Sequence, residues 1–463
     1  MSRAFVHSYI SFGSNVGDRA RNIFNALSEL KKLGTVKNSS FIYRTKPMYV
    51  ENQPNFYNCV VGLDTRLDPS ALVASLKLIE TKLGRDLNAL RYGSRVIDLD
   101  ILTYGDQKIS IDGEGAKFPL QIPHARIAER EFVLRPLCDV AAREGGDILG
   151  ASFEKLLEKY RAESGSEVQK VLPLRGGREL VLGERTISMG VLNVTPDSFS
   201  DGGCNANIDA ALQSARSLID AGCAVLDIGG QSTRPNASYL DPKTELDRVI
   251  PALEAIRKEF PEVALSIDTF HSEVACCAVD AGADMVNDIS SGEMDPEMLK
   301  TVQRLGVPYI MNHTRGTPQT MLSKANYDEI GGVVNGIVVE LGNRIDQLLQ
   351  AGFPRWLLIS DPGLGFAKNY DHNLEVVRDL RGIKERLGGL PMLVGPSRKR
   401  FIGEAIRRGS GGERSASDRD WGTAAAISAC IAQGADIVRI HNAGLVDTVQ
   451  VADALFRDRG TTQ

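Results

Sequence analysis

MGVLNVTPDSFSDGG, residues Met189–Gly203, is the stretch from which the fold can be worked out. It is apolar through Val191 and Leu192, and at Thr195-Pro196 it turns into a polar loop that ends in glycines. A run of this kind predicts a buried strand that delivers the polar residue Asn193 to its end. Similar units recur along the rest of the chain, so the repeat carries the fold prediction.

From Gly190 onward, short runs rich in Val, Ile and Leu alternate with helical stretches such as Ile208–Ala221 and Glu245–Phe260. This alternation predicts parallel strands that are buried on both faces and connected by helices. Eight such units within residues 180–463 fit an α/β TIM (β/α)8 barrel. The predicted strands are Ser188–Val194, Val225–Gly229, Leu265–Thr269, Met285–Ile289, Pro308–Asn312, Trp356–Asp361, Met392–Gly395 and Ile437–Ile440.

The ends of the predicted strands carry polar or charged residues. In chain order these are Asn193, Asp227, Asp268, Asn287 with Asp288, His313 with Arg315, Asp361, Ser397-Arg398-Lys399, and Arg439 with His441. Helix capping explains an Asp or Asn at one strand end, but it is a poor explanation for all of them. Active sites of this barrel lie at the carboxyl-end rim. There Lys399, Arg439 and His441 would form an anion site. Asp268 and Asp361 would accept hydrogen bonds from an amidine-like N–H edge of a ligand.

The first third of the chain has a different organisation. Residues 1–162 alternate strands and helices irregularly and lack a glycine-rich turn between a strand and a helix. This pattern predicts an α+β domain with a mostly antiparallel sheet. Residues 163–179 are polar, contain glycines and Pro173, and are predicted to be a linker.

Asp98-Leu99-Asp100 is the chemical signal of this first domain. Alternation along a strand places both carboxylates on one face, and a purely oxygen ligand set favours Mg²⁺. A solvated acidic edge is the plainer alternative. Arg91 and Arg95 just upstream favour a polyphosphate ligand. The chain has no Gly-Lys dipeptide and no GxGxxG, which excludes a P-loop and a dinucleotide fingerprint.

Composition limits the partners and the compartment. The chain has 463 residues and a net charge of −5, and no segment is long and apolar enough for a membrane span. We therefore expect small-molecule partners, with neither nucleic acid nor membrane. Its 7 cysteines form no CxxC pair, which is typical of reduced thiols in an intracellular protein. The N-terminus runs almost directly into a strand pattern, so we expect a cytoplasmic protein, or a mitochondrial one if a transit peptide was removed.

Several motifs of the first domain occur in an order that resembles hydroxymethyldihydropterin pyrophosphokinase, from about Val6 to Lys159. They are Gly13-Ser14-Asn15, Tyr43-Arg44-Thr45, Gln53-Pro54-Asn55-Phe56-Tyr57-Asn58, Arg95-x-x-Asp98-Leu99-Asp100, and Pro123-His124 with Arg130 and Phe132. The resemblance implies a ferredoxin-like α+β fold and the transfer of a diphosphate from ATP to a pterin hydroxymethyl group. Two positions depart from the family pattern: Phe12 replaces the usual Leu, and Ser94 replaces the usual Pro, which could loosen the turn that aims Arg95.

This resemblance also implies roles for single residues. Asp98 and Asp100 would hold two Mg²⁺ ions. The ATP-binding residues would be Glu80, Arg95, His124 and Arg130. Phe56 and Phe132 would sandwich the pterin, and Asn58 would bond its edge, as suits a flat heteroaromatic ring.

The second half, from about Leu180 to the end, resembles dihydropteroate synthase. The motifs that carry this resemblance are Asn193-Val194-Thr195-Pro196-Asp197-Ser198-Phe199-Ser200-Asp201, Asp227-Ile228-Gly229-Gly230-Gln231-Ser232-Thr233-Arg234-Pro235, Ser266-Ile267-Asp268-Thr269, Asp361-Pro362-Gly363, Ser397-Arg398-Lys399 and Arg439-Ile440-His441. By this resemblance, the dihydropterin diphosphate would be bound by Thr233, Asp268, Asn287, Asp361, Lys399, Arg439 and His441. Asn193 would reach one Mg²⁺ on the diphosphate. Asp201 and Arg234 would close over p-aminobenzoate together with Phe199, Thr233 and Pro235. A homodimer through the barrel is also implied.

The two resemblances support each other because the product of the first reaction is the substrate of the second. They predict a bifunctional folate-biosynthesis enzyme that uses ATP as a substrate. Two alternatives stay open at this point: a pterin-binding regulatory protein with decayed sites, and a monofunctional synthase with a structural appendage.

Overall fold

The computed structural model describes residues 4–86, 92–111, 118–141, 147–148, 151–166, 168–194, 204–231, 239–317, 319–412 and 414–457. The chain divides into two compact units. One comprises Met1–Val181 with Leu348–Trp356, and the other Leu182–Gln347 with Leu357–Gln463. No helix in the described ranges is long and apolar enough to cross a membrane.

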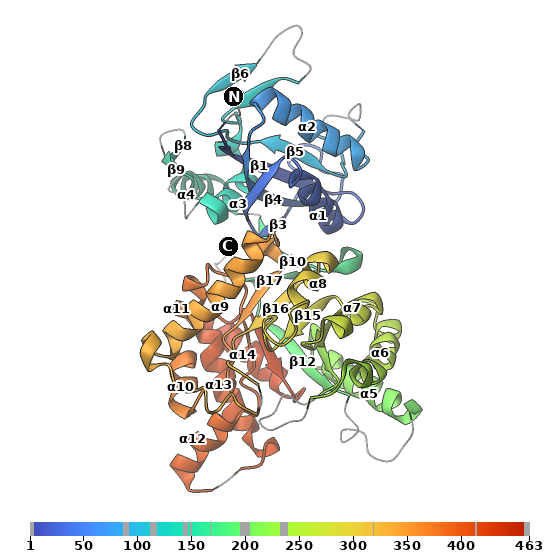
Figure 1. The fold of residues 1–463 in the computed structure, drawn as a ribbon, viewed down its shortest axis with the longest axis vertical. Coiled ribbons are helices and arrows are strands. Elements are labelled where there is room, and N and C mark those ends of the chain that lie inside the picture. The colour runs from blue at the N-terminus through green and yellow to red at the C-terminus, as the bar shows by residue number, and fades with distance from the viewer. Residues whose placement is uncertain are drawn as a thin grey trace. The chain divides into compact units, whose positions relative to one another are not determined.

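An antiparallel sheet forms the centre of the first unit (Figure 1). Its strands are β1 (Val6–Ser14), β2 (Gly34–Ser39), β3 (Ile42–Thr45), β4 (Phe56–Thr65), β5 (Asp98–Ile101), β10 (Gln169–Pro173) and β11 (Glu179–Val181). They are ordered β11-β10-β3-β4-β1-β5, and β2 also pairs with β4. Shorter pairs are β6 (Ile109–Ile111) with β7 (Leu120–Ile122), and β8 (Asp147–Ile148) with β9 (Ala151–Ser152). The α+β class expected for this domain is confirmed.

Four helices cover this sheet: α1 (Arg19–Leu30), α2 (Pro69–Lys82), α3 (Glu131–Ala141) and α4 (Phe153–Ser164). The side chains of Asp18 and Asp68 cap α1 and α2 by accepting backbone N–H bonds. Helices α3 and α4 share a buried cluster with Tyr9 of β1 and Val60 of β4. This packing fixes the sheet face that also carries the site described below.

The expected linker 163–179 is different in the structure. Its first residues complete α4, and residues 169–173 form β10, which pairs with β3. Strand β11 begins at Glu179 and pairs with β10. Backbone hydrogen bonds to β3, more than 120 residues earlier in the chain, hold this hairpin in the sheet.

The second unit is the predicted barrel. Its strands are β12 (Ile187–Asn193), β13 (Val225–Gly229), β14 (Ala264–Asp268), β15 (Met285–Asp288), β16 (Tyr309–Asn312), β17 (Leu358–Asp361), β18 (Leu393–Val394) and β19 (Ile437–Ile440). They are parallel and follow chain order around the sheet, and β19 returns to pair with β12. A parallel bridge between Ser360 and Met392 joins β17 to the start of β18. The strand predicted from Trp356 starts two residues later because Arg355–Leu357 forms a 3-10 turn.

Helices surround these strands (Figure 1). They are α5 (Cys204–Asp220), α6 (Pro242–Glu259), α7 (Ser272–Asp280), α8 (Met298–Leu305), α9 (Val333–Gln350), α10 (Tyr370–Arg378), α11 (Leu380–Arg386), α12 (Arg400–Ser410), α13 (Asp420–Ala432) and α14 (Leu445–Phe456). The strands are almost entirely buried, as expected for a sheet covered on both faces. All carboxyl ends of the strands therefore meet at one rim.

Candidate active sites

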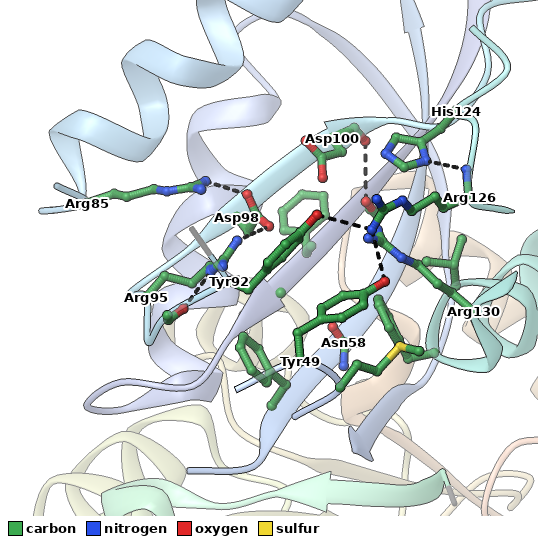
Figure 2. Close-up of a pocket in the computed structure, with 18 of the residues that line it drawn as sticks. Tyr49, Asn58, Arg85, Tyr92, Arg95, Asp98, Asp100, His124, Arg126 and Arg130 are labelled. Atoms are coloured by element: carbon green, nitrogen blue, oxygen red, sulfur yellow. Dashed lines mark hydrogen bonds and ion pairs between the residues drawn. The ribbon is translucent and has the colours of Figure 1, made fainter. Parts of the chain in front are cut away.

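The paired carboxylates of β5 face a cavity of about 900 Å³ in the first unit (Figure 2). Asp98 lies opposite Gly13 of β1, Asp100 lies opposite Ser11, and Leu99 between them is fully buried on the other face. Strand alternation thus places both acids on one side, as the sequence predicted. Strand β5 is an edge of the sheet, but both acids line a cavity together with basic and aromatic side chains, which favours a binding site over a solvated acidic edge.

Basic side chains surround Asp98. Arg95 Nη1 lies 2.8 Å from Asp98 Oδ2, and Arg85 forms an ion pair with Oδ1. Burial alone would raise the pKa of Asp98, but Arg85, Lys77 and Arg95 together hold it below its ordinary value. Lys77 Nζ is also 3.5 Å from Asp100 Oδ1. Sequence reasoning missed Lys77 and Arg85, which lie on and just after α2, in front of the acidic strand.

Glu80 lies behind these groups, outside the cavity lining. Its side chain is fully buried. Its Oε1 accepts the Leu99 amide at 2.7 Å and lies 2.8 Å from Lys77 Nζ and 2.7 Å from Arg85 Nη1. The other oxygen, Oε2, is buried without a hydrogen-bond partner. In this arrangement Glu80 orients the two bases that reach the aspartates; the sequence had suggested a direct role in ATP binding.

The turn that aims Arg95 is tied down by its neighbours. Asn15 Oδ1 accepts the Arg95 amide at 2.8 Å, and Arg95 O accepts the Asn15 amide at 3.1 Å. Ser94 Oγ donates to Gln53 Oε1 at 3.2 Å. The serine that replaces the usual proline therefore contributes a bond that proline could not make, and the loosening expected at this turn is offset.

The predicted pterin residues Phe56, Asn58 and Phe132 line the same cavity as the two aspartates. Asn58 Nδ2 donates to Thr45 Oγ1 at 2.7 Å, which fixes the amide orientation. Gly13 lies opposite, where a Cβ would be 3.2 Å from Asn58 Oδ1, a tight contact that would press on the amide. The aromatic and acidic ends of the predicted site are thus brought together.

His124 and Arg130 also line this cavity. His124 Nδ1 accepts the Arg126 amide at 3.1 Å, and burial lowers the pKa of the imidazole. Sequence reasoning missed a group beside them: Arg126 Nη1 donates to the hydroxyls of Tyr49 at 3.0 Å and Tyr92 at 3.1 Å (Figure 2). Only the fold brings these three loop residues together.

Asp98 and Asp100 fit a divalent cation whose remaining ligands come from water and substrate. The described part of the chain holds no group of three or more His, Cys, Asp and Glu that could enclose a metal. Two carboxylates on one strand face, open to the cavity, suit Mg²⁺, which keeps several waters and takes other ligands from substrate phosphates. Asp98 would then share its oxygens between the cation and its two arginines.

In the second unit, the carboxyl ends of the strands surround a cavity of about 880 Å³. The predicted residues that line it are Asp268, Asn287, Asp361, Lys399, Arg439 and His441. The register of the barrel explains this convergence, since Asp268 lies beside Asn287 on the neighbouring strand. The structure thus brings these six strand-end residues together at one cavity, and their roles in binding stay predictions.

Arg439 organises the floor of this cavity. Its Nε lies 2.6 Å from Asp227 Oδ2, and its Nη2 lies 2.7 Å from Asp268 Oδ2. Asn287 Nδ2 donates to the same Asp227 oxygen at 3.0 Å. Burial raises the pKa of Asp268, and the Arg439 charge only partly offsets it. Asp227 Oδ1 is buried without a hydrogen-bond partner, so the floor keeps one free acceptor.

Lys399 and Asp361 are shifted in opposite directions. Burial and the nearby Arg439 lower the pKa of Lys399 to about 8. Burial raises the pKa of Asp361 to about 6, although the Gly363 amide donates to its carboxylate at 2.8 Å. Lys399 Nζ lies 4.2 Å from the centre of the Phe366 ring. His441 Nδ1 is 3.0 Å from Ser397 Oγ, which fixes the imidazole at the rim.

Lys368 is a residue of this cavity that sequence reasoning missed. It is buried, and its Nζ lies 2.9 Å from His313 Nδ1 and 3.0 Å from Phe366 O. Burial lowers its pKa to about 7. A lysine two residues after the Gly-Phe pair was the available signal, but its burial depends on the fold.

The structure does not place the remaining predicted residues at either cavity. Asn193 is exposed at the end of β12, next to Gly229 of β13, and does not line the cavity. Phe199, Asp201, Thr233, Arg234 and Pro235, together with Arg91 of the first domain, lie outside the described residues. Their roles stay predictions.

Comparisons with known proteins match both parts of the chain. Residues 9–142 match the family model for 7,8-dihydro-6-hydroxymethylpterin-pyrophosphokinase, and residues 189–441 match the model for pterin binding enzymes. The chain is 42% identical to the mitochondrial folate synthesis bifunctional protein of Arabidopsis thaliana, over 97% of this chain and 83% of that protein. A second folate synthesis bifunctional protein of the same plant is 41% identical over 98% of this chain and 97% of its own length.

A solved structure of a two-domain protein is similar over nearly the whole chain. The Plasmodium falciparum HPPK-DHPS protein, a triple mutant with pteroate, superimposes with a TM-score of 0.74 at 25% identity, covering 99% of this chain and 96% of that one. The chain therefore belongs to the family of bifunctional folate-synthesis proteins, in which a hydroxymethyldihydropterin pyrophosphokinase domain precedes a dihydropteroate synthase domain.

Proposed function

We propose how the two cavities carry out the two reactions of this family. In the first, Asp98 and Asp100 would hold two Mg²⁺ ions, which when bound neutralise the charge of the ATP phosphates. Arg95, His124 and Arg130 would hold the triphosphate. Phe56 and Phe132 would enclose the pterin ring, and Asn58 would orient its hydroxymethyl group for attack.

In the barrel, Asp268, Asn287 and Asp361 would read the N–H edge of the dihydropterin. Lys399, Arg439 and His441 would stabilise the diphosphate as the bond between the exocyclic carbon and oxygen breaks and the oxygen takes the electron pair. The amine of p-aminobenzoate would then bond to that carbon and lose a proton. One Mg²⁺ near Asn193 would supply further charge neutralisation. Phe199, Asp201, Thr233, Arg234 and Pro235 would close over the second substrate.

The assembly and the compartment are also part of the proposal. Val451 and Leu455, one turn apart on α14, are 60% and 71% exposed, and Phe456 beside them is 52% exposed. An exposed apolar patch of this kind supports a homodimer that buries it through the barrel. Sedimentation at two protein concentrations would test this. The free cysteines among the described residues support a reducing compartment, and we propose the cytoplasm. Cell fractionation would check it.

The observation that carries the proposal for the first reaction is the pair of carboxylates facing one cavity with arginines and aromatic rings. We expect Asp98→Ala to lower the ATP-dependent reaction about a hundredfold or more, because the metal loses a ligand. Condensation with supplied pterin diphosphate should be unchanged. Asp106→Ala, at an exposed acid just after the same strand, is the matched control.

The same experiment separates the alternatives. Loss of the first reaction alone supports two working sites. If the first reaction survives in Asp98→Ala, the metal assignment is wrong. If the unmodified protein binds pterins but turns over neither substrate, the regulatory alternative replaces the enzymatic one.

A further inference from the structure

The β10–β11 hairpin lies beyond residues 9–142, the segment matched by the pyrophosphokinase model, yet it belongs to the sheet of the first unit. Gln169 of β10 pairs with Arg44 of β3, and Val171 pairs with Ile42. The hairpin covers the edge of β3 that would otherwise end the sheet. Its turn brings β11 back along β10, starting with Glu179 opposite Pro173.

The carboxylate of Glu179 is a shared acceptor for three side chains from other elements. Arg44 of β3 pairs with its Oε1, and the Tyr57 hydroxyl of β4 donates to its Oε2. Arg19, the first residue of α1, lies 3.5 Å from the same Oε2. The Glu179 side chain is only 13% exposed, so this group of charges is largely withdrawn from water.

These contacts converge on the start of β4. Arg19 stacks on the Tyr57 ring at 3.8 Å, and its Nη1 donates to Asn55 O at 3.1 Å. Arg44 and Tyr57 lie opposite each other in the β3–β4 pair. Arg44 is followed by Thr45, and Tyr57 stands between Phe56 and Asn58. Each residue that Glu179 binds therefore contacts or belongs to the β3–β4 segment that carries the proposed pterin residues.

Alternation places Arg44 and Tyr57 on one face of the sheet, and Thr45, Phe56 and Asn58 on the other. Thr45 Oγ1 accepts from Asn58 Nδ2 at 2.7 Å, so a shift of β3 against β4 would move the Asn58 amide. Without the carboxylate, Arg19 and the Tyr57 hydroxyl would lose this acceptor, and Arg44 would keep only the side-chain oxygen of Gln169, 2.9 Å from its Nε. The two guanidinium groups would then lie close together with no negative charge between them. They would have to separate, and β3 and the start of β4 would move with them.

We propose that Glu179 is a positioning residue for the pterin site of the first domain. It acts through Arg44 and Tyr57 and touches no substrate. This inference rests on the proposed assignment of Phe56 and Asn58 to the pterin. It makes the first reaction depend on the last residue of the predicted linker, outside residues 9–142 that the pyrophosphokinase model matches.

The test uses the full-length protein and two variants, Glu179→Gln and Glu179→Ala. Gln keeps an acceptor for the Tyr57 hydroxyl but loses both ion pairs, whereas Ala loses all three contacts. We expect the KM for hydroxymethyldihydropterin to rise about threefold in Gln and about tenfold or more in Ala. The KM for ATP should stay within about twofold, because the ATP residues lie on other segments. Glu158→Gln, an exposed acid on α4, controls for the change in net charge.

The second reaction provides an internal check on folding. Condensation of supplied pterin diphosphate should be unchanged in every variant, because its cavity is built from residues 268–441. Tyr57→Phe should raise the pterin KM less than Glu179→Ala does, and the double variant should be no worse than Glu179→Ala alone.

Three results would decide the matter. Equal rises in the KM for pterin and ATP, or a fall in kcat alone, would overturn the positioning role and leave Glu179 as a general stabiliser. An unchanged pterin KM in Glu179→Ala would also overturn it. Asn58→Ala is measured in parallel. If it too leaves the pterin KM unchanged, the pterin assignment itself has failed. If it raises the pterin KM while Glu179→Ala does not, only the positioning role of Glu179 has failed.

Discussion

Burial sets the charge state of the residues that line the barrel cavity. Asp361 ionises less readily than an ordinary aspartic acid, and Lys399 loses its proton more readily than an ordinary lysine. Both shifts have the sign of desolvation, which disfavours the charged form of either group. The proposed chemistry needs the charged forms: a carboxylate to accept the pterin N–H bonds and an ammonium to hold the diphosphate.

The second reaction should therefore depend on pH with two limbs. Below about pH 6 Asp361 takes up a proton and stops accepting, and above about pH 8 Lys399 gives up its proton. We expect kcat/KM for pterin diphosphate to peak between these values. Lys399→Arg should move the alkaline limb upward. Asp361→Asn should lower the rate and leave an acid limb set by Asp268, whose pKa burial raises to about 7. A profile whose limbs ignore both variants would contradict the assignment, since a limb from the substrate would persist.

Lys368 should matter although it was not predicted from the sequence. Its ammonium connects His313, after β16, to the carbonyl of Phe366, whose ring lies beneath Lys399. We expect Lys368→Met to lower kcat/KM of the condensation about tenfold or more, because the loop that carries Phe366 loses its anchor. Lys300→Met, an exposed lysine on α8, is the control. Equal activity of the two variants would show that the anchor is dispensable.

Between elements, Glu80 joins α2 to β5. One buried oxygen holds the Leu99 amide together with Lys77 and Arg85. Burial raises the pKa of Glu80, yet the two cations on it oppose that rise. This carboxylate thus connects the helix to the acidic strand, beside the contacts of Lys77 with Leu99 O at 3.1 Å and Asp100 Oδ1 at 3.5 Å.

Replacing that carboxylate should cost stability. We expect Glu80→Gln to lower the free energy of unfolding of the first domain by about 2 kcal/mol, since two partly buried cations lose their partner. Denaturant unfolding followed by intrinsic fluorescence, with Glu158→Gln as the reference, measures it. A difference of less than about 0.5 kcal/mol would mean that Asp98 and Asp100 neutralise Lys77 and Arg85 without help.

The strands were the most predictable elements. Burial on both faces makes barrel strands continuous apolar runs, and parallel strands share one rim, so residues at their ends had to converge. The hairpin of β10 and β11 was mistaken for a linker because its glycines and proline dominate the local pattern. Its strand character depends on pairing with β3, far away in the sequence. Alternation within one strand could be predicted from the sequence, but the pairing of β10 with the distant strand β3 could not.

The site residues divide in the same way. Asp98 and Asp100 could be predicted because alternation alone puts them on one face. Glu80 was assigned to ATP from the family resemblance, and its place on α2 does not reveal that its carboxylate binds the Leu99 amide of β5. Arg126 and Tyr49 come from different loops, and only the fold joins them.

At the scale of the whole chain, the described residues that line the two cavities come from separate parts of the sequence. The first is lined by residues 11–133 and the second by residues 268–441. The two reactions should therefore be separable by single substitutions while remaining consecutive in chemistry.

The most direct test is a coupled assay of the purified protein with hydroxymethyldihydropterin, ATP, Mg²⁺ and p-aminobenzoate. We expect AMP and dihydropteroate to form together. In this coupled assay, the Asp98→Ala variant and the Lys399→Met variant should each fail to form dihydropteroate alone. A mixture of the two variants should form it, because the intermediate can pass through solution. AMP formation without dihydropteroate, even when pterin diphosphate is supplied directly, would contradict the central claim that one chain carries both working sites.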